Sequence, residues 1–289
     1  MRRSRGLHEH SVLHAFFSVM TRKTGIVRAQ LKSVTPTTVA ELSDAETNDT
    51  DEASKTPLPA AAQSFNLSVG SPSETLLIFD WDDTLFPTSF IARQGLKVDG
   101  PAPGPHLQAI LDDFAEYVRE TLLEAQQFGT VLIVTNAETG WIDLTARKFL
   151  PTVAREVLSL RQISARSMFE PQGVKTPFEW KEHAFRMVID EHYADYAPGH
   201  VKHVISFGDS AHERDAVIRV CGALGQVKGS GRIRCKSLKF MERPDLEHMK
   251  KEHNLIRQCL GQIVSHVDSL DLCIQTSPTS PAAAEADSR

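Results

Sequence analysis

The sequence predicts an α/β fold in three layers, with helices on both faces of a mostly parallel sheet. Short apolar runs such as residues 75–79 (TLLIF) and 131–134 (VLIV) are typical of strands that are buried on both faces. Amphipathic segments with helical spacing lie between such runs. Strands that alternate with helices are joined by right-handed crossovers, and this connection makes neighbouring strands parallel.

Three further strands are predicted, at residues 201–207, at residues 233–240 and, with a weaker pattern, at residues 162–165. A helix is expected after the Pro/Gly turn near residue 103, because apolar residues follow at helical spacing. Its predicted buried face consists of Leu107, Ile110, Leu111, Phe114, Val118 and Leu122.

Two more helices have recognisable beginnings. Thr176, Pro177 and Glu179 match a capping box with proline in the first turn, followed by the apolar stripe Ala184, Phe185, Val188 and Ile189. A long helix is expected from Pro244, with a stripe that runs from Leu246 to Ile263. The stripe is short and contains His253, so we expect it to pack on the sheet rather than to form a dimer.

The predicted domain spans residues 74–275 of the 289-residue chain. Residues 41–73 are rich in Asp, Glu, Thr, Ser, Ala and Pro, and we expect residues 1–73 and 276–289 to be disordered. Residues 1–40 carry seven basic side chains and one acidic side chain, Glu9. An organelle-targeting segment is therefore the alternative interpretation of residues 1–40.

Composition also limits the partners and the compartment. A net charge of −5 gives no general attraction to nucleic acid or to an acidic membrane surface, and no apolar run approaches the roughly 20 residues of a membrane span. The four cysteines are far apart in the sequence and are expected to be reduced thiols. We expect a cytoplasmic monomer, with organelle import through the basic segment as the alternative.

The strongest chemical pattern is Asp80-Trp81-Asp82-Asp83-Thr84, directly after the first apolar run. In parallel sheets, ligands bind beyond the carboxyl ends of the strands. Two carboxylates separated by one residue suit a division of labour, in which one attacks phosphorus and the other supplies a proton to the leaving group. A divalent cation is needed to hold an anionic nucleophile against an anionic phosphate.

Two other strand ends carry suitable polar groups. Thr135 and Asn136 follow the run at residues 131–134, where a hydroxyl group and backbone N–H groups can hold phosphoryl oxygens. Asp209 follows a glycine after the run at residues 201–207, with Glu213 and Asp215 close behind. Mg²⁺ prefers a few carboxylates together with water and substrate oxygens, which fits Asp209 as a second ligand beside Asp80.

The order of DxDxT, strand-Thr, Lys and GDSxxE resembles the four-motif signature of the haloacid-dehalogenase superfamily. The resemblance runs from about Leu76 to Glu213, roughly half the chain. The sequences around the motifs (FDWDDTLFP, VTNAETGW, WKEHAF) are similar to those of a poorly characterised group of such domains in protists and other eukaryotes. It implies a Rossmann-like sheet of that type. The gaps between the motifs leave no room for a large cap domain.

The resemblance also implies a role for each matching residue. Asp80 would form the aspartyl-phosphate, and Asp82 would protonate the leaving group and then activate water. Thr84 would steady the turn and belongs, with Thr135 and Asn136, to the phosphate-binding set. The magnesium ligands would be Asp80, Asp209 and the main-chain carbonyl of Asp82. The supporting acids would be Glu213 and, with a weaker match, Asp215.

The third motif requires a lysine that offsets charge on the nucleophile and on the transferring phosphoryl group. Lys181 fits the form WKxxAF, whereas Lys175 lies just before the predicted helix cap and resembles a Lys-Pro variant. We favour Lys181 and keep Lys175 as the alternative. The function expected from the resemblance is magnesium-dependent hydrolysis of a phosphomonoester, carried by a small molecule or a phosphoprotein. Phosphoryl transfer by the same fold and a non-catalytic scaffold are the alternatives.

Overall fold

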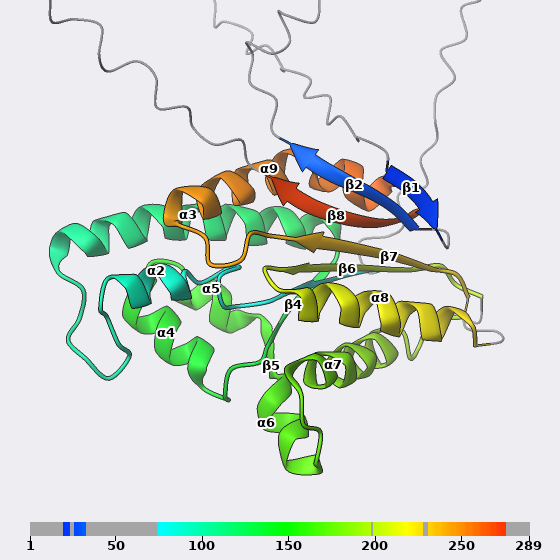
Figure 1. Cartoon of the computed structure of the whole chain (residues 1–289), viewed down its shortest axis with the longest axis horizontal. Helices are drawn as coiled ribbons and strands as arrows, with labels where there is room; N and C mark the ends of the chain where they lie inside the picture. Colours follow the sequence, from blue (N-terminus) through cyan, green and yellow to red (C-terminus); the bar gives the residue numbers. More distant parts are fainter. Residues whose placement is uncertain (1–19, 24–25, 33–73, 198, 228–230, 276–289) are drawn as a thin grey trace, which may run out of the picture.

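The computed structural model describes residues 20–23, 26–32, 74–197, 199–227 and 231–275 (Figure 1). Its strands form one sheet in the order β1-β2-β8-β7-β6-β3-β4-β5. The strands are β1 (Met20–Lys23), β2 (Ile26–Lys32), β3 (Thr75–Phe79), β4 (Thr130–Thr135), β5 (Arg161–Ser164), β6 (Lys202–Gly208), β7 (Ile233–Lys239) and β8 (Ser269–Gln275). Among the described strands, β1 and β2 pair antiparallel. Every other pair of neighbours in this order is parallel. The predicted α/β fold with a mostly parallel sheet is confirmed.

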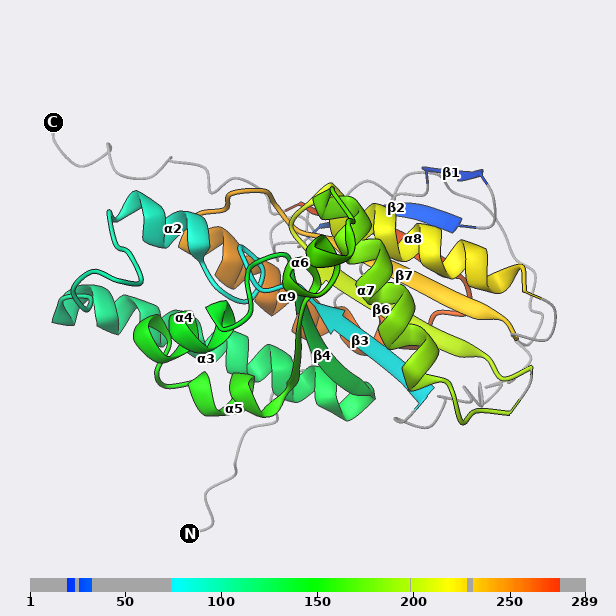
Figure 2. The ribbon, with the colours of Figure 1, turned by 90° about the horizontal axis from the view of Figure 1, so that it is seen from below.

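Helices cover both faces of the sheet, which gives the three predicted layers (Figure 2). The helices are α2 (Thr88–Arg93), α3 (Pro105–Phe128), α4 (Trp141–Phe149), α5 (Ala154–Ser159), α6 (Ala165–Phe169), α7 (Pro177–His192), α8 (Ala211–Gly225) and α9 (Leu246–Ser265), with a 3₁₀ turn at Glu170–Gln172. Helices α3 and α9 belong to one hydrophobic core, whereas α7 and α8 belong to the other. The two cores lie on opposite faces of the same strands.

Strand β3 shows why a fully apolar run predicts a central strand. Leu77 and Phe79 lie in the core with α3 and α9, whereas Leu76 and Ile78 lie in the core with α7 and α8. Successive side chains of a strand point to opposite faces, so a strand covered on both sides needs apolar residues at every position. The predicted strand at residues 75–79 matches β3, and the weaker candidate at residues 162–165 matches β5 within one residue.

The two helices with predicted starts are present, and one of them begins at a different residue. Thr176 and Glu179 form the predicted capping box of α7, and the predicted stripe of α7 is buried. Helix α9 begins at Leu246 rather than at Pro244, because the Asp245 side chain accepts the backbone N–H of His248 at 2.7 Å and caps the helix. The stripe of α9 packs into the core against the sheet, as expected.

The structure adds three strands to those predicted. Strand β8 has an alternating pattern, with Leu270, Leu272 and Ile274 buried, although its sequence contains the buried Asp271. Strands β1 and β2 fall within residues 1–73, where the structure differs from the predicted disorder. Seven residue pairs join β2 to β8, and such pairing depends on distant residues that local composition does not reveal. The other residues of 1–73, and residues 276–289, lie outside the described residues.

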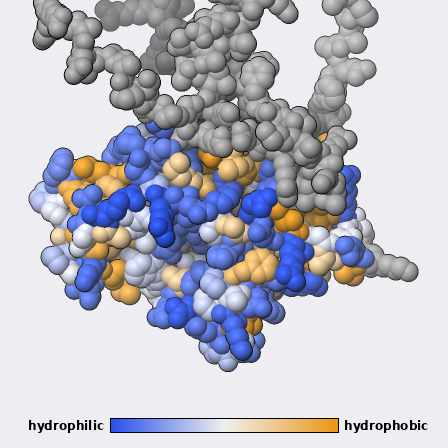
Figure 3. Space-filling view, viewed as in Figure 1, coloured by the Kyte–Doolittle hydropathy of each residue, from blue (hydrophilic) through white to orange (hydrophobic). Residues whose placement is uncertain are grey.

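The surface of the described residues mixes hydrophilic and hydrophobic side chains on the face shown in Figure 3. The exposed large hydrophobic residues come from separate elements: Leu123, Leu144, Met168, Val227, Met241 and Val267. None of the described helices combines the length and the apolar composition needed to cross a membrane.

Lys236 in β7 is fully buried, with its Nζ donating to the Val264 carbonyl at 2.6 Å near the end of α9. Burial lowers the pKa of Lys236 from 10.5 to about 7. The unfolded chain therefore binds more protons between pH 7 and 10.5, so this lysine destabilises the fold most below pH 7 and least near pH 10. We expect Lys236→Met to raise the free energy of unfolding by about 1–3 kcal/mol at pH 6.5.

This gain should shrink as the pH rises toward 10, which thermal denaturation of both proteins across that range would measure. Lys175→Met, at an exposed position, is the matched control and should change stability little at either pH. A gain for Lys236→Met that stays constant with pH would contradict the assigned cause.

Candidate active site

Three adjacent strands bring their carboxyl ends to the same edge of the sheet. Phe79 of β3 is in register with Ile133 of β4 and with Phe207 of β6. The backbone N–H of Asp80 continues this pairing by donating to the Phe207 carbonyl at 2.9 Å. Asp80, Thr135 and Asp209 therefore leave neighbouring strands at one edge, as the sequence predicts.

The turn after β3 is tightly folded. The Trp81 carbonyl accepts the N–H groups of Thr84, Leu85 and Phe86, and Asp83 lies at φ 49°, in the left-handed region. The Asp83 carboxylate stabilises this conformation by accepting from the backbone N–H and the hydroxyl of Ser89, at 2.8 and 2.5 Å. Within this turn Asp80 and Trp81 are buried, whereas Asp82 is partly exposed.

Trp81 packs beneath the site rather than shielding it. Its side chain is fully buried and stacks on Phe86, with ring centroids 5.6 Å apart. Its Nε1–H donates to the Thr145 hydroxyl of α4 at 3.0 Å. This hydrogen bond joins the turn after β3 to α4.

Asp82 is oriented by hydrogen bonds from three different segments. Its Oδ1 accepts from Trp141 Nε1 at 2.9 Å and from the Thr88 hydroxyl at 2.5 Å. Its Oδ2 accepts a longer bond, 3.3 Å, from the Thr135 hydroxyl. Oδ1, with two donors at shorter distance, is thus the more firmly held of the two carboxylate oxygens.

Lys181 lies at the centre of the site. Its side chain is fully buried, and its Nζ lies 2.6 Å from Asp80 Oδ1, 3.0 Å from Glu213 Oε1 and 2.5 Å from the Val134 carbonyl. Lys175 is exposed and lies beside Gln172 and His183 at a separate hollow of the surface. Of the two candidates, Lys181 is therefore the one that the fold brings to Asp80.

The charges of this buried group act on one another. Burial raises the pKa of Asp80, and the carboxylates of Glu213 and Asp82 raise it further, against the opposing effect of Lys181. Burial alone would lower the pKa of Lys181, but Asp80 and Glu213 outweigh it and the pKa is raised. The pKa of Glu213 is lowered despite its burial, because Lys181 and Ser210 stabilise its charged form. One ammonium group is thus shared by two carboxylates.

Asp209 is also a largely buried carboxyl group with other carboxylates nearby. Burial, with Glu213 and Asp83 nearby, raises the pKa of Asp209 to about 7. In the part of the chain that the structure describes, no three His, Cys, Asp or Glu side chains are gathered as a metal site. Mg²⁺ is commonly held by one or two carboxylates, with water and substrate oxygens completing its shell. Asp80, Asp209 and the Asp82 carbonyl offer oxygen donors, the type of ligand that this ion prefers.

The other predicted residues are placed as follows. Thr84 is fully buried on the core side of the turn, where its carbonyl accepts from His253 Nε2 at 3.0 Å. Asn136 donates from Nδ2 to the Pro177 carbonyl at 3.1 Å and so links the end of β4 to the start of α7. Asp215 is exposed and pairs with Arg214. Thr84 and Asn136 have structural contacts, and the fold does not bring Asp215 or Lys175 to Asp80.

Three contributors to the site were not predicted. Trp141 and Thr88 orient Asp82, and His253 of α9 supports the turn from below. Burial lowers the pKa of His253 to about 4, so the ring is neutral and donates from Nε2. Trp141 lies six residues after Thr135, and Thr88 lies six residues after Asp82. This closeness in sequence to two predicted site residues was the one signal that could have identified them.

Gly208 allows Glu213 to reach Lys181. A Cβ atom at Gly208 would lie 2.5 Å from Glu213 Cγ and 2.8 Å from Glu213 Cβ. We expect Gly208→Ala to destabilise the fold by about 1–3 kcal/mol and to reduce any activity that depends on Lys181, because Glu213 must move. Gly222→Ala is the matched control, since a Cβ there meets open space. Thermal denaturation of both variants tests this, and equal stabilities would contradict it.

The sequence matches no protein-family model, and comparisons with curated proteins and with solved structures likewise found no match. The site is therefore interpreted from its own geometry.

Proposed function

We propose that this protein is a magnesium-dependent phosphomonoester hydrolase of the haloacid-dehalogenase type, which acts through a phosphorylated Asp80. The observation that carries the proposal is the buried Lys181 ammonium group, which binds both Asp80 and Glu213 beside the fixed carboxylate of Asp82. Lysines are rarely buried without a partner, and this one lies where charge on a transferring phosphoryl group would be neutralised.

In the first step, an Asp80 oxygen attacks phosphorus. Lys181 holds Asp80 Oδ1, so the other oxygen, Oδ2, is the one that forms the new bond. The bond between phosphorus and the ester oxygen breaks, and Asp82 gives its proton to that oxygen as the alcohol leaves. Thr135, whose hydroxyl bonds Asp82 at the end of β4, would contact the phosphoryl oxygens.

In the second step, Asp82 takes a proton from water. The water oxygen attacks the phosphorus of the aspartyl-phosphate, inorganic phosphate leaves and the Asp80 carboxylate is restored. A bound Mg²⁺ ion would supply positive charge to the nucleophile and the phosphoryl oxygens. The residues that would hold it are Asp80, Asp209 and the Asp82 carbonyl.

Hydrolysis of 4-nitrophenyl phosphate tests this proposal. We expect turnover with Mg²⁺, loss of turnover with EDTA, and recovery when Mg²⁺ is added back. Asp209→Asn should raise the Mg²⁺ concentration needed for half-maximal activity by about tenfold or more. Release of inorganic phosphate at the same rate as nitrophenol identifies water as the acceptor, whereas a shortfall of phosphate would indicate a phosphoryl transferase. Full activity in EDTA would contradict the proposed metal dependence.

A further inference from the structure

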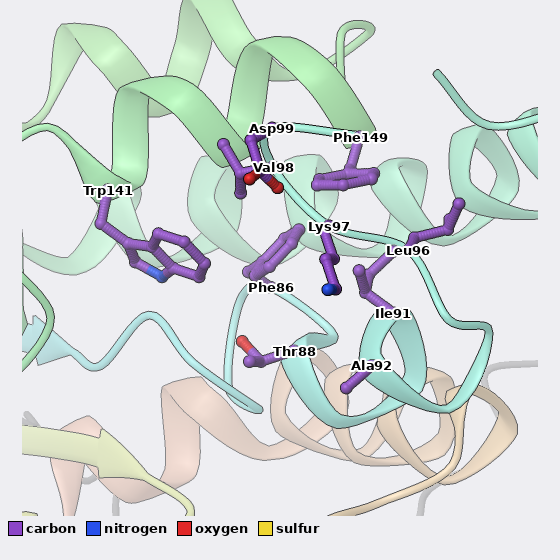
Figure 4. Close-up of a pocket in the computed structure, with 10 residues that line it drawn as sticks. All are labelled: Phe86, Thr88, Ile91, Ala92, Leu96, Lys97, Val98, Asp99, Trp141 and Phe149. Carbon is purple, nitrogen blue, oxygen red and sulfur yellow. The ribbon is translucent and has the colours of Figure 1, made fainter. Parts of the chain in front are cut away.

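An apolar cavity of about 380 Å³ lies between residues of α2, of α4 and of the loop that follows α2 (Figure 4). It is lined by Phe86, Thr88, Ile91, Ala92, Leu96, Lys97, Val98, Asp99, Trp141 and Phe149. Its size falls at the lower end of the range typical of small-molecule sites. The cavity lies outside the group formed by Asp80, Lys181 and Glu213, none of which lines it.

The cavity shares two residues with the proposed catalytic machinery. Thr88 and Trp141 line it, and both donate to Asp82 Oδ1. Their polar hydrogens are thus used on Asp82, and Figure 4 shows Trp141 and Thr88 on either side of the backbone near Phe86, with Trp141 to the left of the Phe86 ring and Thr88 below it. The cavity is therefore lined by two of the residues that hold Asp82, the proposed acid.

The walls of the cavity indicate which leaving group it accepts. The ring of Phe86 lies edge-on to Trp141, with centroids 6.5 Å apart, and tilted toward Phe149, with centroids 5.8 Å apart. Ile91, Leu96 and Val98 add aliphatic surface. Aromatic and aliphatic walls favour a flat apolar group, whereas the hydroxyl groups of a sugar or polyol would lose their hydrogen bonds there. Lys97 and Asp99 also line the cavity, and both are exposed.

One wall of the cavity is held in place by Lys148. Its Nζ donates to the carbonyl oxygens of Lys97, Val98 and Gly100, at 2.8, 2.9 and 2.5 Å. Three bonds from one ammonium group hold the loop of residues 97–100 against α4. The cavity is therefore preformed, and binding does not require the loop to be ordered first.

A second cavity, of about 360 Å³, is lined by Thr135 and by a mixture of polar and apolar residues: Glu138, Thr139, Gly140, Ile142, Gln162, Ile163, Ser164, Ser167 and Met168. Its connection to Asp82 is the single 3.3 Å bond from Thr135, the residue assigned above to the phosphoryl oxygens. Thr88 and Trp141, which line the apolar cavity, bind the other oxygen of Asp82, Oδ1. Because Thr135 and the cavity beside it are assigned to the phosphoryl oxygens, the apolar cavity is the one that remains for the leaving group.

We infer that the substrate is an aryl phosphate, whose aromatic leaving group occupies the cavity between Phe86, Val98 and Trp141. The inference rests on the proposed function and specifies its substrate class. The same chemistry occurs in phosphate esters of small phenols and in phosphotyrosine.

The test compares 2-naphthyl phosphate with acetyl phosphate, which has a leaving group too small to fill the cavity. Val98→Trp should obstruct the cavity and lower the ratio of kcat/KM for the two substrates by about tenfold or more. Met168→Trp, which obstructs the second cavity, is the matched control and should leave the ratio within about twofold of wild type. An unchanged ratio in Val98→Trp, or a fall in Met168→Trp alone, would overturn the inference.

The result with acetyl phosphate distinguishes a failure of the cavity assignment from a failure of the proposed function. Hydrolysis of acetyl phosphate with an unaltered ratio in Val98→Trp would leave the proposed function standing and remove the cavity as the leaving-group site. If the wild type hydrolyses neither ester, the proposed function fails, and binding of 2-naphthol measured by calorimetry decides on the cavity. Binding of 2-naphthol that Val98→Trp abolishes would support the cavity as an aryl-binding site, and no binding to the wild type would overturn it.

A second experiment measures kcat/KM for a phosphotyrosine peptide. Comparison with kcat/KM for 2-naphthyl phosphate shows whether the aryl phosphate is carried by a protein or by a small molecule.

Discussion

Asp80→Asn is expected to lower kcat for 4-nitrophenyl phosphate by at least about a thousandfold, because an amide cannot form the acyl-phosphate bond. The variant should still fold. Lys181 keeps the Glu213 carboxylate at 3.0 Å and the Val134 carbonyl at 2.5 Å, so the buried ammonium group is not left without a partner. The measurement is kcat under saturating Mg²⁺, together with the melting temperature of both proteins.

Asp215→Asn is the control for this prediction. Asp215 stands two residues after Glu213, but it is exposed and pairs with Arg214. Its substitution should leave kcat within about twofold of wild type. Asp80→Asn with kcat close to that of wild type would remove Asp80 as the nucleophile.

Lys181→Met should affect both turnover and stability. Removing the ammonium group leaves the carboxylates of Asp80 and Glu213 buried without the cation that they share. Breaking a buried ion pair by removing one partner typically costs about 3–5 kcal/mol. Turnover should fall by at least about a hundredfold, since the charge that would stabilise the transferring phosphoryl group is lost. Lys175→Met, at the rejected candidate position, should leave both quantities near wild type.

A second variant separates the chemical role of Lys181 from its structural role. In Lys181→Met/Glu213→Gln, one buried negative charge is removed together with the positive one. We expect this double variant to recover part of the lost free energy of unfolding but none of the lost turnover. Recovery of turnover in step with stability would show that Lys181 acts only by maintaining the fold.

Much of the sheet, and of the edge that carries the candidate site, could be predicted from the sequence. A strand covered on both sides must be apolar at every position, so the run at residues 75–79 identified a central strand and placed Asp80 at its end. The capping box at Thr176 placed the start of α7, and the position of Lys181 within α7 follows from it. These signals are local and depend on few neighbouring residues.

The remaining features depend on contacts between distant segments. Strand β2 is held by its pairing with β8, more than two hundred residues away in the chain, and its own composition resembles the flanking residues. Asp82 receives its hydrogen bonds from Thr88 and Trp141, which lie on different helices. Thr84 matches a motif position, but its buried side chain faces the core, which motif spacing cannot show.

Chemical trapping of the phosphorylated enzyme tests the central claim most directly. The wild-type protein would be mixed with 4-nitrophenyl phosphate and Mg²⁺, quenched in acid and reduced with borohydride, which converts an aspartyl-phosphate to homoserine. We predict homoserine at position 80, in amounts that depend on substrate, and none there in Asp80→Asn. Catalytic turnover without modification of Asp80, or modification at another carboxylate, would contradict the assignment of Asp80 as the residue that carries the phosphoryl group.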